Sequence, residues 1–246
     1  MEQKDDNTWY STWFDSPYYH ILYQHRNHAE AEKAVCTLLA FANVEKGSEV
    51  MDLCCGKGRH ATLLEKAGNI VTGLDLSPAN INYCRTFENE NLHFNVHDMR
   101  EVYKADKFDY VFNLFTSFGY FDHEGNEQTL IAIKEGLKAG GKVIIDFLNV
   151  TPVITALPAQ EIISLDGIDF YIHKYLENNR IYKQIKFTDK GCKYSFCEEV
   201  NALQLSDFER YFEHTGFKLI SVSGDYDGSS FNKHQSKRLI LLAERK

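Results

Sequence analysis

Short apolar runs alternate with amphipathic segments along the first two thirds of this chain. The apolar runs predict β-strands over residues 49–54, 69–74, 92–96, 110–114 and 142–148. Apolar residues at helical spacing predict helices over about 28–42, 59–67 and 126–137, and Ser77-Pro78 is a helix-start signal. Because helical crossovers join parallel strands, this order predicts an α/β fold with a mostly parallel sheet.

The pattern changes after about residue 152. Short alternating segments over 162–165, 170–175, 181–187 and 194–196 are separated by turn dipeptides such as Asp166-Gly167, which predicts a small antiparallel β insertion. A helix over 206–214 and strands over 218–223 and 238–243 follow. We therefore expect an aromatic and helical N-terminal cap over 1–44, an α/β core made of 45–151 and 202–246, and the insertion over 152–201, above the acceptor site.

Composition and charge narrow the function classes. The 246 residues carry a net charge of −8 and no run of Lys and Arg, which argues against a nucleic-acid partner. The apolar stretches are too short to span a bilayer, and the acidic, polar start lacks a signal-peptide pattern. We therefore expect no membrane association. Six cysteines show no zinc-type pairing, so we also expect no metal and a reducing cytoplasm.

A glycine turn after the first predicted strand is the strongest chemical signal. Gly56 and Gly58 allow a sharp turn and the close approach of a ligand. Dinucleotide-binding enzymes have a third glycine where this chain has Ala61, and here Asp52 stands beside the turn. A carboxylate favours a cationic ligand over a pyrophosphate. S-adenosylmethionine (SAM), which carries an ammonium and a sulfonium, therefore fits better than a dinucleotide.

Acidic residues also follow the second and third predicted strands. Asp75 is placed to accept the hydroxyls of a ribose, since Ser77 already occupies the cap position of the next helix. Asp98 is a candidate for the adenine amino group, with the Met99 backbone at the ring edge, although Asp98 also fits a surface turn. Leu76 and Asn113, at the ends of the second and fourth strands, complete the candidate cofactor site.

The segment after the fourth strand should lie where the methyl donor meets its acceptor. Tyr120 and His123 are candidate catalytic groups because each has a polar tip, and Phe118 is a candidate substrate contact or a core residue. The N-terminal aromatic stretch either covers the core or faces the substrate. Its candidate substrate contacts are Tyr18, Tyr19 and Tyr23.

The segments DLCCGKGRHA (52–61), GLDLSPANI (73–81), HDMR (97–100), FDYVFNLFTSFGYF (108–121) and LKAGGKVIIDFLN (137–149) resemble the class I SAM-dependent methyltransferases. They are most similar to the bacterial small-molecule branch with CCGxGRH and FTSFGYF-type motifs. The resemblance implies a Rossmann-like seven-stranded sheet whose last strand is antiparallel. It also implies SAM contacts at Asp52, Gly56, Gly58, Asp75, Asp98 and Met99, with Arg59 as a partner for the SAM carboxylate. The insertion resembles the acceptor-covering flap of related sugar-amine N-methyltransferases.

These observations predict a methyltransferase that converts SAM to S-adenosylhomocysteine by in-line displacement, acting on a small-molecule acceptor that we expect to be an amine. The chain is expected to act as a monomer or homodimer. The alternatives are a non-catalytic SAM-binding or SAM-sensing protein, an O-, RNA- or protein-directed methyltransferase, and a NAD-dependent oxidoreductase that uses the glycine turn.

Overall fold

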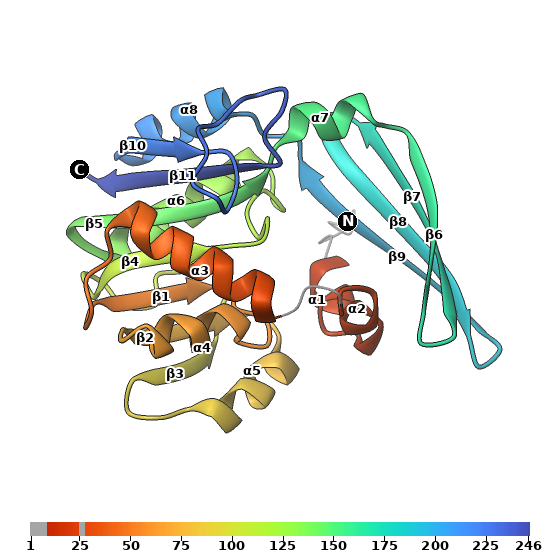
Figure 1. Cartoon of the computed structure of the whole chain (residues 1–246), viewed down its shortest axis with the longest axis horizontal. Helices are drawn as coiled ribbons and strands as arrows, with labels where there is room; N and C mark the ends of the chain where they lie inside the picture. The colour runs from red at the N-terminus through yellow and green to blue at the C-terminus, as the bar shows by residue number, and fades with distance from the viewer. Residues whose placement is uncertain (1–8, 25–27) are drawn as a thin grey trace, which may run out of the picture.

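The computed structural model describes residues 9–24 and 28–246, which form two β-sheets with helices around them (Figure 1). The larger sheet and its helices lie at one side, and the smaller sheet lies at the other. Two short helices from the N-terminal part, α1 (Trp9–Trp13) and α2 (Pro17–Leu22), lie between them. The cavity described below is where these parts meet.

The larger sheet has seven strands in the order β10-β11-β5-β4-β1-β2-β3. The last strand, β11, pairs antiparallel with both β10 and β5, and the other neighbouring pairs are parallel. This confirms the predicted Rossmann-like sheet with an antiparallel last strand. The strands are β1 (Glu49–Leu53), β2 (Ile70–Asp75), β3 (Leu92–Val96), β4 (Phe108–Asn113), β5 (Leu137–Leu148), β10 (Phe217–Ser223) and β11 (Arg238–Arg245).

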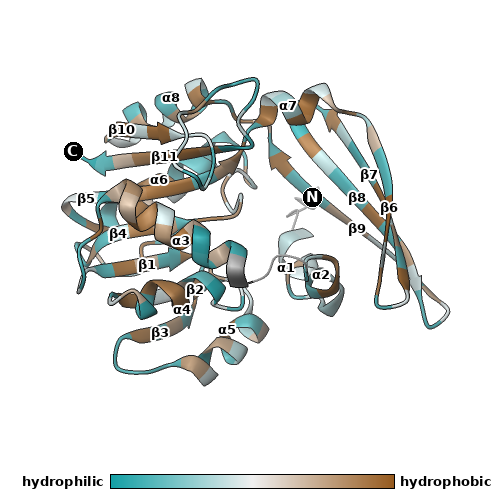
Figure 2. Ribbon diagram, in the orientation of Figure 1, coloured by the Kyte–Doolittle hydropathy of each residue, from teal (hydrophilic) through white to brown (hydrophobic). Residues whose placement is uncertain are grey.

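Helices cover both faces of this sheet because its central strands are apolar on both sides (Figure 2). Val143 and Ile145 of β5 belong to the cluster that includes residues of α6 and α8, whereas Ile144 belongs to the cluster with α3 and α4. Successive side chains of a strand point to opposite faces, so one strand contributes to two cores. The helices of the two layers are α3 (His28–Ala42), α4 (Arg59–Lys66), α5 (Pro78–Cys84), α6 (His123–Gly136) and α8 (Leu205–Thr215), and a short 3₁₀ helix, η1 (Arg85–Phe87), follows α5.

Helix α3 belongs to the core layer, although the sequence pattern grouped it with the N-terminal cap. Val35, Leu38 and Ala42 pack with residues of the larger sheet and of α4. Helices α1 and α2 and the residues next to them cover the smaller sheet, and α3 does not belong to this cap.

The smaller sheet is an antiparallel meander in the order β6-β7-β8-β9. It comprises β6 (Ala159–Leu165), β7 (Ile168–Glu177), β8 (Arg180–Asp189) and β9 (Cys192–Asn201), and α7 (Val150–Thr155) leads into it. Positive φ angles at Asp166, Asn178, Asn179 and Lys190 mark its three turns, as the predicted turn dipeptides require. Trp13 and Leu22 are buried against this sheet, so α1 and α2 pack on its inner face.

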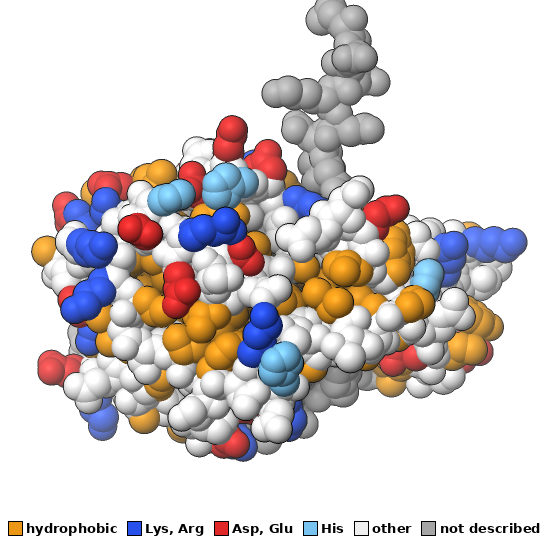
Figure 3. Space-filling model, turned by 90° about the horizontal axis from the view of Figure 1, so that it is seen from above, with side chains coloured by type: hydrophobic (Ala, Val, Ile, Leu, Met, Phe, Trp, Pro, Cys, Tyr) orange, Lys and Arg blue, Asp and Glu red, His pale blue; other side chains and the backbone are white. Residues whose placement is uncertain are grey.

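The surface is mixed in charge. On the face seen in Figure 3, acidic and basic side chains are interspersed, and hydrophobic side chains show between them. No helix within residues 9–24 and 28–246 is both long and apolar enough to cross a membrane.

One glycine in β2 is required by packing rather than by backbone conformation. A Cβ at Gly73 would lie 2.5 Å and 2.6 Å from two ring atoms of Phe94 and 3.1 Å from the Cys55 sulfur. Phe94 is only 1% exposed, so its ring has little room to move. We expect Gly73→Ala to lower the free energy of unfolding by about 1–3 kcal/mol in urea denaturation.

The double variant Gly73→Ala/Phe94→Leu is the control, since a smaller residue at 94 leaves space for the new methyl group. It should be less destabilised than the sum of the two single substitutions. Wild-type stability of Gly73→Ala would contradict this packing argument.

Candidate functional site

The predicted glycine turn connects β1 to α4, and its two glycines have different roles. Both have positive φ angles, 54° at Gly56 and 74° at Gly58. A Cβ at Gly56 would meet no atom of the described part of the chain within 4 Å, so this position borders open space. A Cβ at Gly58 would lie 2.9 Å from the ring of Phe94. Gly56 therefore leaves room for a ligand, and Gly58 leaves room for the core.

Asp75, at the end of β2, holds this turn in place. Its Oδ2 accepts a hydrogen bond from the Gly56 N–H (2.8 Å), and its Oδ1 accepts one from the Ser77 N–H (2.9 Å). Burial raises the pKa of the Asp75 carboxyl above its usual value, and these backbone donors oppose the shift. The carboxylate thus links the ends of β1 and β2 and also lines the cavity beside them.

Three carboxylates that lie far apart in the sequence gather around one thiol. Burial raises the pKa of Cys54 well above its usual value, and the negative charges of Asp75, Asp52 and Asp98 add to the shift. The acidic residues that follow or end β1, β2 and β3 therefore converge, as expected for the carboxyl ends of neighbouring parallel strands. This arrangement places three carboxyl groups near one another at one edge of the sheet.

The three carboxylates differ in their surroundings. Asp52 is 1% exposed, accepts a hydrogen bond from the Ala61 N–H and has one oxygen, Oδ2, with no hydrogen-bond partner among the described residues. Burial raises the pKa of Asp52 to about 7. Burial also disfavours ionised Asp98, but hydrogen bonds from the side chain and backbone of Arg100 outweigh this and lower its pKa below the usual value.

A cavity of about 650 Å³ extends from this region to the N-terminal helices and the smaller sheet. Its walls include most of the residues predicted from the sequence: Gly56, Arg59, Asp75, Leu76, Asp98, Met99, Tyr19, Tyr23 and Tyr120. Asp52, Gly58 and Asn113 support the walls from behind. The Asn113 amide, for example, is fully buried and donates to the Leu53 carbonyl at 3.2 Å.

Three predicted acceptor-side residues lie elsewhere. Phe118 is fully buried against Phe208 and Tyr211, with ring centroids 5.5 Å and 6.1 Å away, so it is a core residue. His123 begins α6 with its side chain 66% exposed and 3.6 Å from Glu127. The predicted contact of Phe118 with the substrate and the predicted catalytic role of His123 are wrong, because neither side chain lines the cavity.

Tyr18 is the third residue of this kind. Its hydroxyl donates to Asp189 at 2.9 Å, and its ring packs against Phe187 and Tyr194 of the smaller sheet. Tyr18 is therefore a contact between α2 and the smaller sheet, and it does not line the cavity.

Sequence reasoning missed several residues of the cavity wall. Among them are Lys183 of β8 and Glu198 of β9, which lie in strands whose alternation indicated only a small sheet. The sequence pattern also gave no sign of the unusual backbone conformation of Phe115 and Thr116. Both have positive φ angles, 62° and 60°, which are costly for residues other than glycine.

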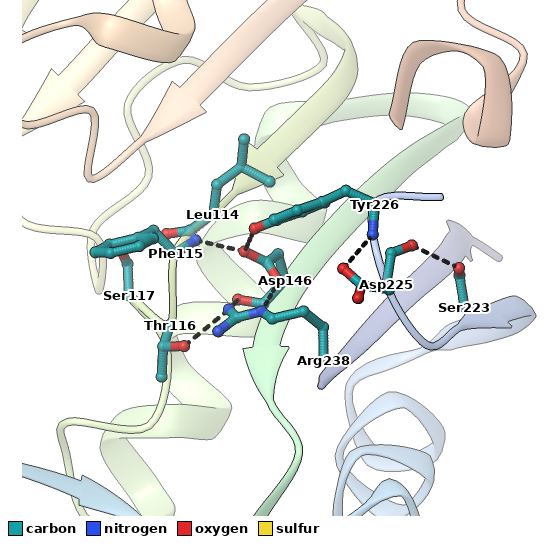
Figure 4. Close-up of polar contacts among 9 residues, drawn as sticks. All are labelled: Leu114, Phe115, Thr116, Ser117, Asp146, Ser223, Asp225, Tyr226 and Arg238. Atoms are coloured by element: carbon teal, nitrogen blue, oxygen red, sulfur yellow. Dashed lines mark hydrogen bonds and ion pairs between the residues drawn. The ribbon is translucent and has the colours of Figure 1, made fainter. Parts of the chain in front are cut away.

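A buried ion pair holds these two residues in place (Figure 4). Asp146 of β5 accepts hydrogen bonds from the Phe115 N–H (2.8 Å) and the Tyr226 hydroxyl (2.5 Å), and it pairs with Arg238 at 2.6 Å. Arg238 also donates to the Thr116 hydroxyl at 2.9 Å. The pair thus fixes the turn that places Phe115 against the cavity. No local sequence pattern indicated this arrangement, because Asp146, Phe115 and Arg238 are far apart in the sequence.

The comparisons with known proteins agree with this architecture. Residues 50–141 match a family described as a methyltransferase domain. The chain is 25% identical over 212 residues to a putative methyltransferase, YqeM, of Bacillus subtilis, covering 82% of this chain and 85% of the relative. It is 24% identical over 208 residues to dTDP-3-amino-3,4,6-trideoxy-alpha-D-glucopyranose N,N-dimethyltransferase of Streptomyces venezuelae, covering 80% and 87%.

The fold is also that of a solved S-adenosylmethionine-dependent methyltransferase from Clostridium acetobutylicum. The two structures align with a TM-score of 0.76 and 19% identity, covering 93% of this chain and 96% of the other. The predicted fold is therefore confirmed, and the match over residues 50–141 is to a methyltransferase domain.

His60, in the cavity wall, generates a prediction about pH. Burial and the neighbouring Arg59 lower the pKa of His60 to about 3. In the unfolded chain its pKa is about 6.5, so below that pH the unfolded state binds a proton that the folded state does not. As pH falls from about 6.5 towards 3, this group therefore lowers the free energy of unfolding, by up to about 1.4 kcal/mol per pH unit.

We expect His60→Asn to gain stability relative to the wild type by about 1 kcal/mol between pH 6 and pH 5, measured by urea denaturation. Asp52 has the opposite effect on the free energy of unfolding as pH falls, because its pKa is raised in the folded protein. Since Asp52 is present in both proteins, its contribution cancels when their stabilities are compared. Parallel stability curves for the two proteins over this range would show that His60 binds a proton in the folded state.

Proposed function

We propose that this chain is a SAM-dependent methyltransferase that methylates an amine nitrogen of a small molecule. The observation that carries this proposal is one continuous cavity. At one end it is bordered by the carboxyl ends of the first three strands, and at the other by aromatic side chains of the N-terminal helices and by the smaller sheet. Its volume of about 650 Å³ lies in the usual range for sites that bind small ligands.

The residues at the sheet end fit SAM. A molecule with an ammonium and a sulfonium suits the three carboxyl groups of Asp52, Asp75 and Asp98 at this end. The open space above Gly56 allows close approach to the backbone. Asp75 would accept the ribose hydroxyls, and Leu76, 40% exposed beside it, offers an apolar surface to the nucleoside.

The remaining SAM contacts are assigned by position. Asp98 and the Met99 backbone would meet the adenine edge, since they follow β3. Arg59 would pair with the SAM carboxylate at the start of α4, where the helix N-terminus also favours an anion. Asp52, Gly58 and Asn113 would act by holding these contacts in place.

The methyl group of SAM is already activated by the positive sulfur, so the main task of the protein is alignment and exclusion of water. Holding two reactants in line can contribute about 7–11 kcal/mol. The rings of Phe14, Tyr19, Tyr23 and Tyr120 line the part of the cavity where the acceptor would lie. They would exclude water there, and Tyr120 could position the acceptor through its hydroxyl.

An amine acceptor is supported by two observations. The Streptomyces venezuelae relative, similar over most of both chains, is named as an N,N-dimethyltransferase of an amino sugar. The acceptor end of the cavity also contains a carboxylate, Glu198, among aromatic rings. Such surroundings favour a basic nitrogen over a neutral oxygen.

The direct test is a screen of small molecules with the purified protein and isotope-labelled SAM. We expect the label to appear in a nitrogen-methylated product, identified by mass spectrometry, together with S-adenosylhomocysteine. Label found only in oxygen-methylated products, or in none of a broad panel of amines, would overturn the amine assignment.

Asp75 is the residue whose removal should weaken the cofactor most clearly. We expect Asp75→Ala to reduce S-adenosylhomocysteine affinity by about 1.5–3 kcal/mol, measured by calorimetry on a variant shown to be folded, because hydrogen bonds to a charged group are lost. Asp227→Ala, in an exposed loop, is the matched control and should bind as the wild type does. Unchanged affinity in folded Asp75→Ala would exclude Asp75 from the cofactor site.

A further inference from the structure

Glu198 is an acidic residue in the acceptor part of the cavity, and two other side chains fix its position. Its Oε1 accepts hydrogen bonds from the Trp13 indole N–H (2.7 Å) and the Tyr23 hydroxyl (2.8 Å), and its Oε2 lies 2.9 Å from the same hydroxyl. Its side chain is 19% exposed. The carboxylate is thus held rigidly between the N-terminal helices and β9.

Lys183 of β8 completes this group. Its Nζ donates to the Tyr23 hydroxyl at 2.7 Å and lies 3.8 Å from Glu198 Oε2. The Tyr23 hydroxyl accepts from Lys183 and donates to Glu198. Burial, followed by the charge of Glu198, raises the pKa of Tyr23 well above its usual value, so the phenol keeps its proton. Tyr23 is therefore the neutral hydrogen-bond donor to Glu198.

One function of Glu198 is to connect the N-terminal helices to the smaller sheet, but its hydrogen-bonding capacity is larger than this requires. A carboxylate has about four lone-pair positions on its two oxygens. Trp13 and Tyr23 occupy two of them on Oε1, whereas among residues 9–24 and 28–246 the Tyr23 hydroxyl alone lies at hydrogen-bond distance from Oε2, with Lys183 further away. Glu198 also lines the cavity. It can therefore accept a further hydrogen bond from a molecule there.

The neighbouring rings indicate which kind of molecule this is. The ring of Tyr19 lies 4.8 Å from that of Tyr23, and Phe115 lies edge-on to Tyr23 at 6.2 Å. Burial raises the pKa of the Tyr120 hydroxyl well above its usual value, and neighbouring groups, Glu198 among them, add to the shift. A carboxylate surrounded by aromatic faces suits an amine or ammonium, through a charge-assisted hydrogen bond and cation–π attraction.

We propose that Glu198 binds the acceptor nitrogen and stabilises the positive charge that forms on it, an inference that rests on the proposed function above. The neutral amine donates an N–H to Glu198 Oε2, which leaves its lone pair free. The lone pair forms the new N–C bond as the C–S bond breaks, and the electrons of that bond stay on sulfur. The nitrogen keeps its protons, so positive charge moves from sulfur towards Glu198. A fixed carboxylate at that end favours the transition state over the ground state.

The test uses two probes of the same shape. Benzylamine carries a basic nitrogen, and benzyl alcohol carries a hydroxyl group in its place. Each is titrated into the protein saturated with S-adenosylhomocysteine at neutral pH, and binding is measured by calorimetry. We expect the wild type to bind benzylamine at least tenfold more tightly than benzyl alcohol. Glu198→Gln keeps the shape and the acceptor oxygen but removes the charge, so it should abolish this preference and retain S-adenosylhomocysteine affinity.

Glu177→Gln, an exposed residue of β7, is the matched control and should keep the wild-type preference. Lys183→Met gives a second test with the opposite sign. It removes the cation that competes for Glu198, so the preference for benzylamine should increase, which a purely structural role of Glu198 would not cause.

The outcomes separate the two proposals. If the wild type does not bind S-adenosylhomocysteine, the proposed function fails. If it binds S-adenosylhomocysteine but shows no benzylamine preference, or if the preference survives in Glu198→Gln or falls in Lys183→Met, the assignment of Glu198 is wrong and the proposed function stands.

Discussion

The candidate site depends on the two backbone hydrogen bonds that Asp75 accepts from Gly56 and Ser77. Parallel pairing of β1 and β2 brings the ends of these strands together, but it does not determine the path of the chain beyond them. One buried carboxylate fixes both turns. The chain thereby keeps an open space beside Gly56.

Buried carboxylates fix the other walls of the cavity in the same way. Asp146, paired with Arg238, holds the strained turn at Phe115 and Thr116, and Glu198 holds the N-terminal helices against β9. Breaking such a buried pair leaves an uncompensated charge, which costs several kcal/mol. The cavity thus has walls from three distant parts of the sequence, each attached through a charged group that accepts hydrogen bonds from within the protein.

The sequence predicted the parts of the site that depend on periodicity and topology. Short apolar runs located the strands, and the parallel order then placed Asp52, Asp75 and Asp98 at one edge. The sequence-based prediction failed for Phe118, His123 and Tyr18, because tertiary packing decides which way the side chain of a residue in a loop or a short helix points. It could not identify Glu198 or Lys183, since in an alternating strand a charged residue of the cavity wall has the same pattern as a solvated one. The strained turn at Phe115 depends on Asp146, 31 residues away, which no local pattern reveals.

The central claim is that the space at the carboxyl ends of β1, β2 and β3 accommodates an adenosyl compound with positive charge rather than a dinucleotide. Calorimetric titration of the purified protein with SAM and, separately, with NAD⁺ tests this claim most directly. Saturable binding of SAM at one site per chain, with no binding of NAD⁺, is the predicted result. Saturable binding of NAD⁺ without binding of SAM would contradict it.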